Sequence, residues 1–228
     1  AIEILNDIDC NDNVVPGQLG DVIIFGDGTK SLRFYNGYFE IEASYFIAKG
    51  VTFSCRNPNT NDLTVGPALK AVDTTVVLQD VVFEGCYNPT GYITRAALYV
   101  DSDSILVARN TTWQNISLNY DSYGMIGSES EFVYTYDCKF ITSAEDAYND
   151  RPQIRFNSLS TVIFSRPSFD ISTQKYYILV ESSTYGGAIY FDFGEDSVGP
   201  FTTNEPYFLE GPDEGLCNIC DESISNNL

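Results

Sequence analysis

The stretch YFIAKGVTF, residues 45–53, decides the fold, because its short apolar run closed by an aromatic residue returns five more times along the chain. The closing aromatics are spaced 30, 30, 27, 29 and 24 residues apart. A repeat of about 20–50 residues is typical of a solenoid, in which each repeat packs only on its neighbours. The later segments are VVLQDVVF ending at Phe83, ILVARNTTW at Trp113, VYTYDCKF at Phe140, TVIFSRPSF at Phe169 and GGAIYFDF at Phe193.

Apolar or small residues recur two, five and seven positions before each closing aromatic. These offsets predict inward-pointing side chains on both sides of a two-residue break, which is polar in five copies, as in Lys49-Gly50. The sixth copy has Ile189-Tyr190 there and fits less well. Two short strands that meet at a polar corner once per turn predict a coil of parallel strands with internal ladders. The expected ladders are Val51, Val81, Thr111, Cys138, Pro167 and Phe191; Ala48, Leu78, Ala108, Thr135, Phe164 and Ala188; and Phe46, Val76, Leu106, Val133, Val162 and Gly186.

The N-terminal segments AIEILNDIDC, GDVIIFGDGTKSLRF and YFEIEASYFIAKGVTFSC read as a first strand, a turn rich in Gly and Asp, and a first full rung. With these segments and Gly186-Gly187-Ala188-Ile189, the chain resembles right-handed parallel β-helix surface proteins of the pectin-lyase-like and polymorphic-outer-membrane-protein-like kind. It departs from their FxxN element, because Glu84-Gly85-Cys86 follows Phe83. The resemblance implies an all-β, right-handed parallel β-helix of about six to seven rungs over residues 1–200. We expect residues 201–228 to form an irregular acidic cap or tail.

The charge of the chain limits its partners. Its 228 residues include 32 acidic and 12 basic side chains, which gives a formal net charge of -20. Nucleic-acid binding draws its affinity from clustered Lys and Arg, so this composition argues against a nucleic-acid partner. No apolar run approaches the ~18 residues that a membrane span requires. Such a surface suits a saline exterior, and we expect an extracellular or cell-surface protein without a cofactor.

The six cysteines are Cys10, Cys55, Cys86, Cys138, Cys217 and Cys220. An even number suits an oxidising compartment, although six cysteines allow fifteen pairings and the sequence selects none. Cys55 and Cys86 leave equivalent rungs near the same corner, so a bridge between them is one candidate, with Cys10, Cys217 and Cys220 as the others. Cys138 shares the parity of Phe140 and should point inward as a small hydrophobe. With one CxxC pair, Cys217 to Cys220, and no His, we predict no metal site.

Two glycosylation sequons lie five residues apart, Asn110-Thr111-Thr112 and Asn115-Ile116-Ser117. Asn110 falls at the polar corner of one rung, and Asn115 follows Trp113 by two residues. Exposed sequons on a disulfide-capable chain predict glycans at Asn110 and Asn115.

Many β-helices cleave polysaccharides, so the resemblance also implies candidate catalytic residues. The absence of His removes the commonest general base and every Ser-His-Asp arrangement. The remaining candidates are the carboxylates Asp101, Asp103, Glu145, Asp146 and Asp150, with Arg151 and Arg155. The cluster from Glu145 to Arg155 joins acids to arginines, as proton abstraction beside an acidic sugar would need. It sits in the loop after a rung and lacks a repeated partner column, so we predict no catalytic residue. If the chain is an enzyme, a polysaccharide lyase or glycoside hydrolase acting on acidic glycans is expected.

The stretch Asp7-Ile8-Asp9-Cys10-Asn11-Asp12 places oxygen ligands at alternate positions, as a calcium loop does. The Gly that such a loop needs at its sixth position is Asp12, and no Glu follows at its twelfth. We interpret the stretch as the first strand of the helix and its outgoing turn.

Three classes of function remain. A structural or adhesive protein that self-assembles head to tail into a filament or wall layer would use the helix ends, with Tyr207, Phe208 and Leu209 as assembly candidates. A carbohydrate-binding module would stack sugars on exposed tyrosines, and a polysaccharide lyase or hydrolase is the third class. We favour the first. The tyrosines considered were Tyr120, Tyr123, Tyr134, Tyr136, Tyr176 and Tyr177.

Overall fold

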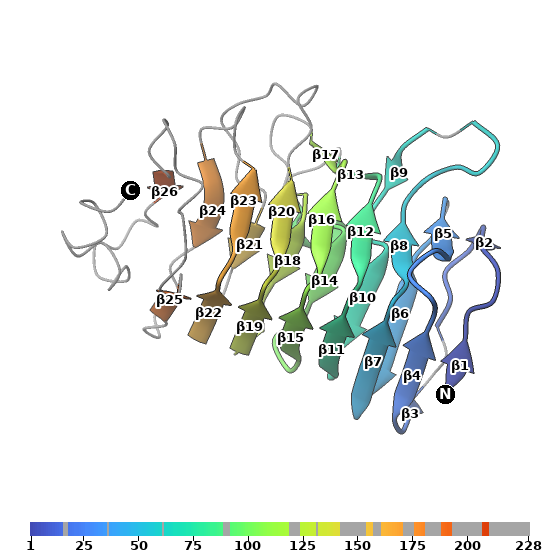
Figure 1. The fold of residues 1–228 in the computed structure, drawn as a ribbon, viewed down its shortest axis with the longest axis horizontal. Helices are drawn as coiled ribbons and strands as arrows, with labels where there is room; N and C mark the ends of the chain where they lie inside the picture. Colours follow the sequence, from blue (N-terminus) through green and yellow to red (C-terminus); the bar gives the residue numbers. More distant parts are fainter. Residues whose placement is uncertain are drawn as a thin grey trace.

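The chain forms an all-β parallel solenoid, described by a computed structural model (Figure 1). From residue 169 onward, and at a few earlier positions, only the backbone is described. The described residues are 1–15, 18–35, 37–60, 62–88, 92–118, 124–130, 132–141, 154–156, 161–170, 176–180, 188–192 and 207–209.

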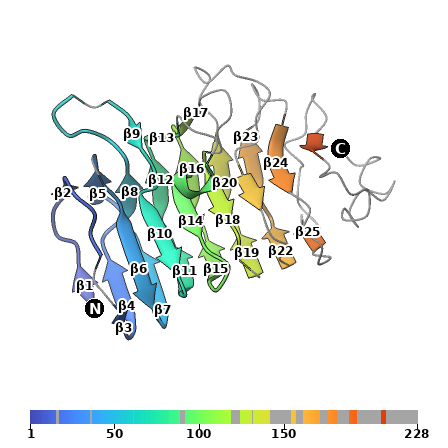
Figure 2. The same ribbon diagram turned by 180° about the vertical axis from the view of Figure 1, so that it is seen from behind.

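Successive strands join three long parallel sheets in turn, so that one coil contributes one strand to each sheet (Figures 1 and 2). Sheet A contains β1 (Ile2–Glu3), β4 (Val22–Phe25), β7 (Tyr45–Lys49), β11 (Thr75–Gln79), β15 (Ile105–Arg109), β19 (Phe132–Tyr136), β22 (Thr161–Ser165) and β25 (Ala188–Asp192). Sheet B contains β2 (Ile8–Cys10), β5 (Ser31–Phe34), β8 (Thr52–Ser54), β12 (Val82–Glu84), β16 (Thr112–Gln114), β20 (Lys139–Ile141) and β23 (Ser168–Asp170). Sheet C contains β3 (Gln18–Leu19), β6 (Phe39–Ala43), β10 (Leu69–Val72), β14 (Leu98–Val100), β18 (Ile126–Ser128), β21 (Ile154–Phe156), β24 (Tyr176–Val180) and β26 (Tyr207–Leu209).

Between sheets B and C the chain adds smaller elements. The strands β9 (Thr64–Val65), β13 (Cys86–Asn88) and β17 (Ser117–Leu118) form a short parallel sheet, and a 3-10 helix spans Ile93–Arg95. This part of each coil varies in length, which accounts for the spacings of 30, 30, 27 and 29 residues between the first five closing aromatics.

The predicted fold class is confirmed, with two differences. We expected six to seven rungs, whereas the described strands number eight in sheet A, eight in sheet C and seven in sheet B. We also expected two strands per turn, and these correspond to sheets A and B. Sheet C is a third wall that the repeat did not predict. Its last described strand, β26, pairs in parallel with β24, while the domain boundary at residue 200 stays a prediction.

The predicted internal ladders are present in the first five copies. The register predicted for the sixth copy is wrong, because Ala188 pairs with Thr161 rather than Phe164, and Phe191 pairs with Phe164 rather than Pro167. Strand pairing aligns Phe46 with Val76 and Ala48 with Leu78 in sheet A, and Phe53 with Phe83 in sheet B. These side chains are fully buried. The rings of Phe53, Phe83, Trp113 and Phe140 lie nearly parallel, with centroids 5.4, 5.5 and 4.9 Å apart along the column. The side chain of Phe169 lies outside the described part, although its backbone pairs with Phe140.

The polar corner between sheets A and B is built on a column of left-handed residues. Gly50, Asp80, Asn110, Asp137 and Arg166 have φ between 47° and 60°. Gly, Asn and Asp tolerate this conformation best, which explains why they stand at four of the five corners. The N–H of each of the first four donates to a carbonyl of the next coil at 2.9–3.1 Å, so the corner is itself a hydrogen-bonded ladder.

A disulfide joins Cys55 and Cys86, one coil apart, as we considered from their equivalent positions. It closes a loop with a sequence separation of 31, which is worth roughly 3–4 kcal/mol in the chain-entropy account. Cys138 is buried, as predicted, and its Sγ lies 3.5 Å from the carbonyl oxygens of Ala108 and Tyr136.

Candidate functional site

The first coil is the most exposed apolar region among the described residues. Ile2 and Leu5 are 55% and 66% exposed. The strands of this coil, β1, β2 and β3, lie at one end of sheets A, B and C, so each has an outer edge without a strand partner in the described part. Unpaired edges beside exposed apolar side chains form a surface that can accept further strands. The remaining exposed apolar residues of this coil are Ile8, Val14 and Val15.

The sequence had indicated part of this surface. The segment AIEILNDIDC was predicted as a first strand, but Val14 and Val15 were not predicted as part of an exposed face. Their signal is the pair of adjacent β-branched residues in the polar context NDNVVPG, at residues 11–17. Adjacent residues of an extended segment point to opposite faces, so a pair of this kind leaves one apolar side chain toward solvent.

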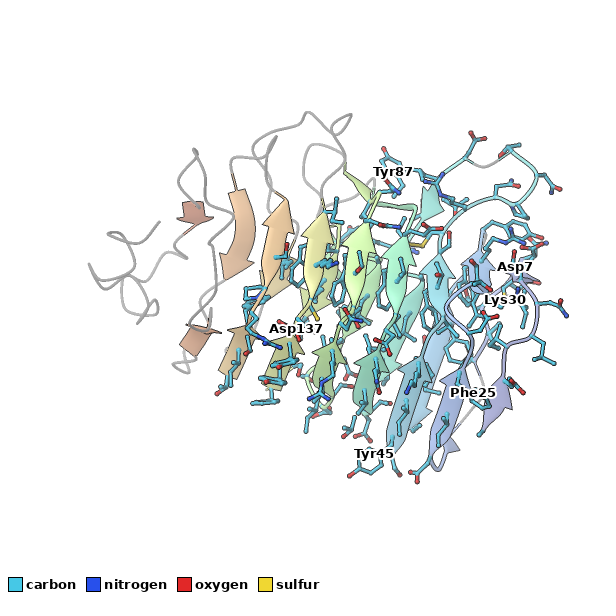
Figure 3. The ribbon with its side chains drawn as sticks, in the orientation of Figure 1. Asp7, Phe25, Lys30, Tyr45, Tyr87 and Asp137 are labelled. Atoms are coloured by element: carbon cyan, nitrogen blue, oxygen red, sulfur yellow. A yellow bond between two sulfur atoms is a disulfide. The ribbon has the colours of Figure 1, made fainter. Side chains whose placement is uncertain are left out.

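Arg33 pairs with two carboxylates of residues 7–12, the stretch that resembles a calcium loop. Arg33 Nε lies 2.7 Å from Asp9 Oδ1, and its Nη2 lies 3.5 Å from Asp7 Oδ2. The backbone N–H of Ser31 also donates to Asp7 Oδ1 at 3.0 Å. These carboxylates connect the first coil to the second, and Figure 3 labels Asp7 in this part of the solenoid. Across the described residues, no group of three or more His, Cys, Asp or Glu is placed to hold a metal ion.

The catalytic candidates Asp101 and Asp103 lie in the turn that leads into β15. Asp101 Oδ1 accepts the Ser104 hydroxyl at 2.6 Å and the backbone N–H of Asp73 at 3.2 Å, which are contacts that build a turn. Asp103 lines an open hollow of about 340 Å³ together with Glu42 and Asp73. Among the described residues that line the hollow, none is basic.

The predicted glycosylation residues are both on the surface. Asn110 is exposed at the corner between sheets A and B, and its Nδ2 donates to Asp80 Oδ1 at 2.7 Å. Asn115 is exposed at the end of β16, also in the left-handed conformation with φ 51°. Both positions could accept a glycan without disturbing the interior, and their modification stays a prediction.

The tyrosine candidates give a mixed picture. Tyr134 and Tyr136 lie on the outer face of β19, but the Tyr136 ring is covered by two guanidinium groups. Arg109 Cζ lies 5.1 Å and Arg166 Cζ lies 4.4 Å from its centroid. A ring held between two cations is an unfavourable platform for a sugar, because its faces are already in contact. Arg166 also bonds Asp137, which Figure 3 labels at this corner.

Several predicted residues lie beyond what the structure describes. The side chains of Tyr207, Phe208 and Leu209 are not described, although their backbone forms β26. The same holds for Arg155, Tyr176 and Tyr177, whose backbone belongs to β21 and β24. Among the described cysteines, Cys10 and Cys138 carry no disulfide. The residues outside the described part are Tyr120, Tyr123, Glu145, Asp146, Asp150, Arg151, Cys217 and Cys220.

Comparison with known proteins adds no relative. No protein-family model matches the chain, and neither a curated protein nor a solved structure matches it. Within the described ranges, no helix is long and apolar enough to cross a membrane.

Proposed function

We propose that this chain is a non-enzymatic structural or adhesive rod of an extracellular surface, and that it assembles head to tail into a filament or wall layer. The observation that carries this proposal is the exposed first coil. Leu5, Ile2 and Val15 are each more than half exposed at the end of the stack where three sheets end together. The resemblance to pectin-lyase-like surface β-helices supports the same assignment, since their rungs are also read as stacked structural units.

The open end of a solenoid favours binding of a second copy of the same chain. A second copy that stacks its last coil on the first coil would pair the free edges of all three sheets and bury the exposed apolar side chains. Each copy carries a net charge of -20, so repulsion opposes the contact at low ionic strength. Salt screens that repulsion, and association should therefore strengthen as salt rises.

Sedimentation velocity across an ionic-strength series tests the proposal. The parent chain should form a growing series of oligomers as salt increases. The double variant Leu5→Asp/Ile8→Asp should lose that series, because it adds desolvated charges at the contact while changing side chains already exposed in the single chain. Tyr92→Asp, at a position 69% exposed and far from the first coil, is the matched control and should follow the parent.

The tail can be examined in the same way. A Tyr207→Ser/Phe208→Ser/Leu209→Ser variant should also remain smaller than the parent. A parent chain that stays monomeric at every salt concentration would remove the filament proposal.

The exterior setting has its own test. Material from the native source should carry glycan mass on the peptide with Asn110 and Asn115, and a peptide of unmodified mass would contradict this part of the proposal. The purified chain should release no unsaturated uronides from polygalacturonate, with or without calcium. Turnover in that assay would replace the structural proposal with a lyase.

A further inference from the structure

The outer face of sheet A is apolar where a solvated sheet is normally polar. Alternation along each strand places one set of side chains inside and the other outside. The outer set forms a central column of five half-buried side chains with apolar bodies, and Tyr45 and Ile105 beside it are 50% and 39% exposed. Figure 3 shows Tyr45 extending from β7 away from the body of the solenoid. The central column is Ile47, Val77, Val107, Tyr134 and Ile163, aligned by the strand pairing.

The turns that lead into this face carry negative charge. Asp73 and Asp103 line the hollow beside the starts of β11 and β15, with Glu42 one coil earlier. Glu129 occupies the corresponding turn before β19. The described residues of these turns, 42–44, 72–74, 101–104 and 129–130, include no Lys or Arg.

The opposite edge of the same face carries positive charge. Lys49 and Arg109 end β7 and β15 and are both exposed, and Arg166 follows the end of β22. The corner also holds two carboxylates. Asp137 pairs with Arg166, and Asp80 Oδ1 accepts from the neutral Asn110 amide, so the cations exceed the carboxylates by one. An apolar strip therefore lies between one acidic edge and one edge with a small excess of positive charge, on a protein whose net charge is strongly negative.

We propose that this face binds a second copy of the chain, face to face, around a two-fold axis parallel to the solenoid axis. That rotation reverses the strand direction across the contact, so each β15 faces its partner's β15 in the opposite direction. The acidic start of one strand, at Asp103, then lies across from the basic end of the other, at Arg109. A two-fold axis perpendicular to the solenoid axis would instead set acidic edge against acidic edge, which is disfavoured.

The size of the face predicts a weak pair. Six strands from β4 to β22 at about 4.8 Å spacing, each about five residues long at about 3.3 Å per residue, cover roughly 450 Å² on each copy. Two copies would bury roughly 900 Å², below the ~1,200 Å² at which stable interfaces begin. This lateral contact is separate from the end-to-end contact of the proposed function, because it uses a wall of the solenoid and leaves both ends free.

Charge reversal tests the pairing. At about 0.15 M salt, in the Leu5→Asp/Ile8→Asp background that blocks the ends, the chain should still reach a monomer–dimer equilibrium. Asp103→Arg and Arg109→Asp should each raise the dimer dissociation constant by about tenfold or more, because each places like charges opposite one another at two symmetric sites. An equal mixture of the two variants should recover the parent affinity within about threefold, since every pair is then complementary again.

The control is Asp62→Arg, because Asp62 is exposed and lies outside the face. This variant changes the net charge as Asp103→Arg does and should leave the dimer dissociation constant unchanged. This control matters because lowering the net charge alone would favour association. A background variant that stays monomeric at millimolar concentration would overturn the lateral contact while leaving head-to-tail assembly of the parent intact. Single variants that dimerise like the parent would overturn it as well.

Cross-linking tests the direction of the axis. Ile47→Cys and Val107→Cys lie two coils apart on the central column, and each should join to its own copy through a short bismaleimide. Glu84→Cys, on the outer face of sheet B, should not. Self-linking at only one of the two column positions would overturn the parallel arrangement, because a perpendicular axis brings a residue opposite itself at one coil only.

Discussion

Two buried columns run along this solenoid, and they are built from opposite chemistry. In sheet B the rings of Phe53, Phe83, Trp113 and Phe140 stack in the buried interior. At the turn from sheet C to sheet A, the hydroxyl groups of Thr74, Ser104 and Ser130 form a second column that is equally buried. One column is stabilised by apolar burial and dispersion, whereas the other satisfies backbone groups that the turn would leave without partners.

The contacts of the hydroxyl column show that second role. Thr74 Oγ1 accepts the N–H of Ala43 at 3.0 Å, and Ser104 Oγ accepts the N–H of Thr74 at the same distance. Ser130 Oγ lies 2.6 Å from the carbonyl oxygen of Ser104 and donates to it. Like residues thus stack on like residues in both columns. The rings stack because they bury apolar surface, and the hydroxyl groups stack because each satisfies a backbone group of a neighbouring coil.

The largest effect should come from removing a ring from the aromatic column. Phe83→Ala removes a fully buried ring with stacked neighbours on both sides, and we expect a loss of roughly 3–5 kcal/mol in the free energy of unfolding. Val82→Ala, on the outer face of the same strand, should lose less than about 1 kcal/mol. Denaturant unfolding measures both. A loss below about 1 kcal/mol for Phe83→Ala would mean that this ring is outside the core.

Ionisation of the buried Cys138 thiol should lower the free energy of unfolding slightly less than Phe83→Ala does. Burial raises the pKa of the Cys138 thiol to about 11, against about 9 in an unfolded chain. The folded protein favours the neutral thiol, so this contribution to stability is complete below pH 9 and is lost as the pH rises through 11. The total contribution is roughly 2–3 kcal/mol.

Unfolding measured at several pH values tests this contribution. Cys138→Ala should lose less stability between pH 9 and 11 than the parent chain does. Cys10→Ala, which removes a half-buried thiol, should change the alkaline loss less. Identical pH profiles for the parent and Cys138→Ala would show that the Cys138 thiol does not carry the effect.

Breaking the hydroxyl column should have an intermediate effect. Thr74→Val keeps the shape of the side chain but leaves the N–H of Ala43 without its acceptor, which should cost about 1–3 kcal/mol. Thr75→Val, one residue later on the outer face, is the isosteric control and should change stability by about 0.5 kcal/mol or less. Equal losses for Thr74→Val and Thr75→Val would contradict the stabilising role of the buried Thr74 hydroxyl.

The smallest effect is expected at Trp113, which places a polar N–H group inside the aromatic column. Trp113 Nε1 is buried in the aromatic column and has no acceptor among the described residues. Trp113→Phe removes ring volume, which destabilises, and also removes a donor without a partner, which stabilises. The two changes oppose each other, so we expect a net change below about 1 kcal/mol. A loss near 3 kcal/mol would indicate that the indole N–H is paired.

The sequence predicted sheets A and B because their inward residues recur at constant offsets from one aromatic. It identified the corner between them as polar, but not as left-handed, although Gly50, Asp80, Asn110 and Asp137 are residue types that tolerate positive φ. Sheet C was missed because its strands begin 16, 15, 13 and 14 residues after Phe53, Phe83, Trp113 and Phe140, so no fixed offset marks them.

The surfaces that carry the proposals were only partly predictable. A first strand could be inferred from residues 1–10. The outer face of sheet A could not, since a run such as YFIAK is apolar on both faces and its inner residues alone account for the repeat. Asp103 and Arg109, at the two edges of this face, lie six residues apart in the sequence, but an acidic edge and an opposite edge form only when several coils pair.

The column of left-handed corners makes the length of this molecule adjustable. Every coil turns at the same place, and each corner donates to the next in the same way, so one coil is an interchangeable unit of 27–30 residues. Adding or excising one unit would move the far end by about 4.8 Å while every remaining contact keeps its type. Duplicating a segment between equivalent corners could therefore lengthen the protein in fixed steps without requiring a new core.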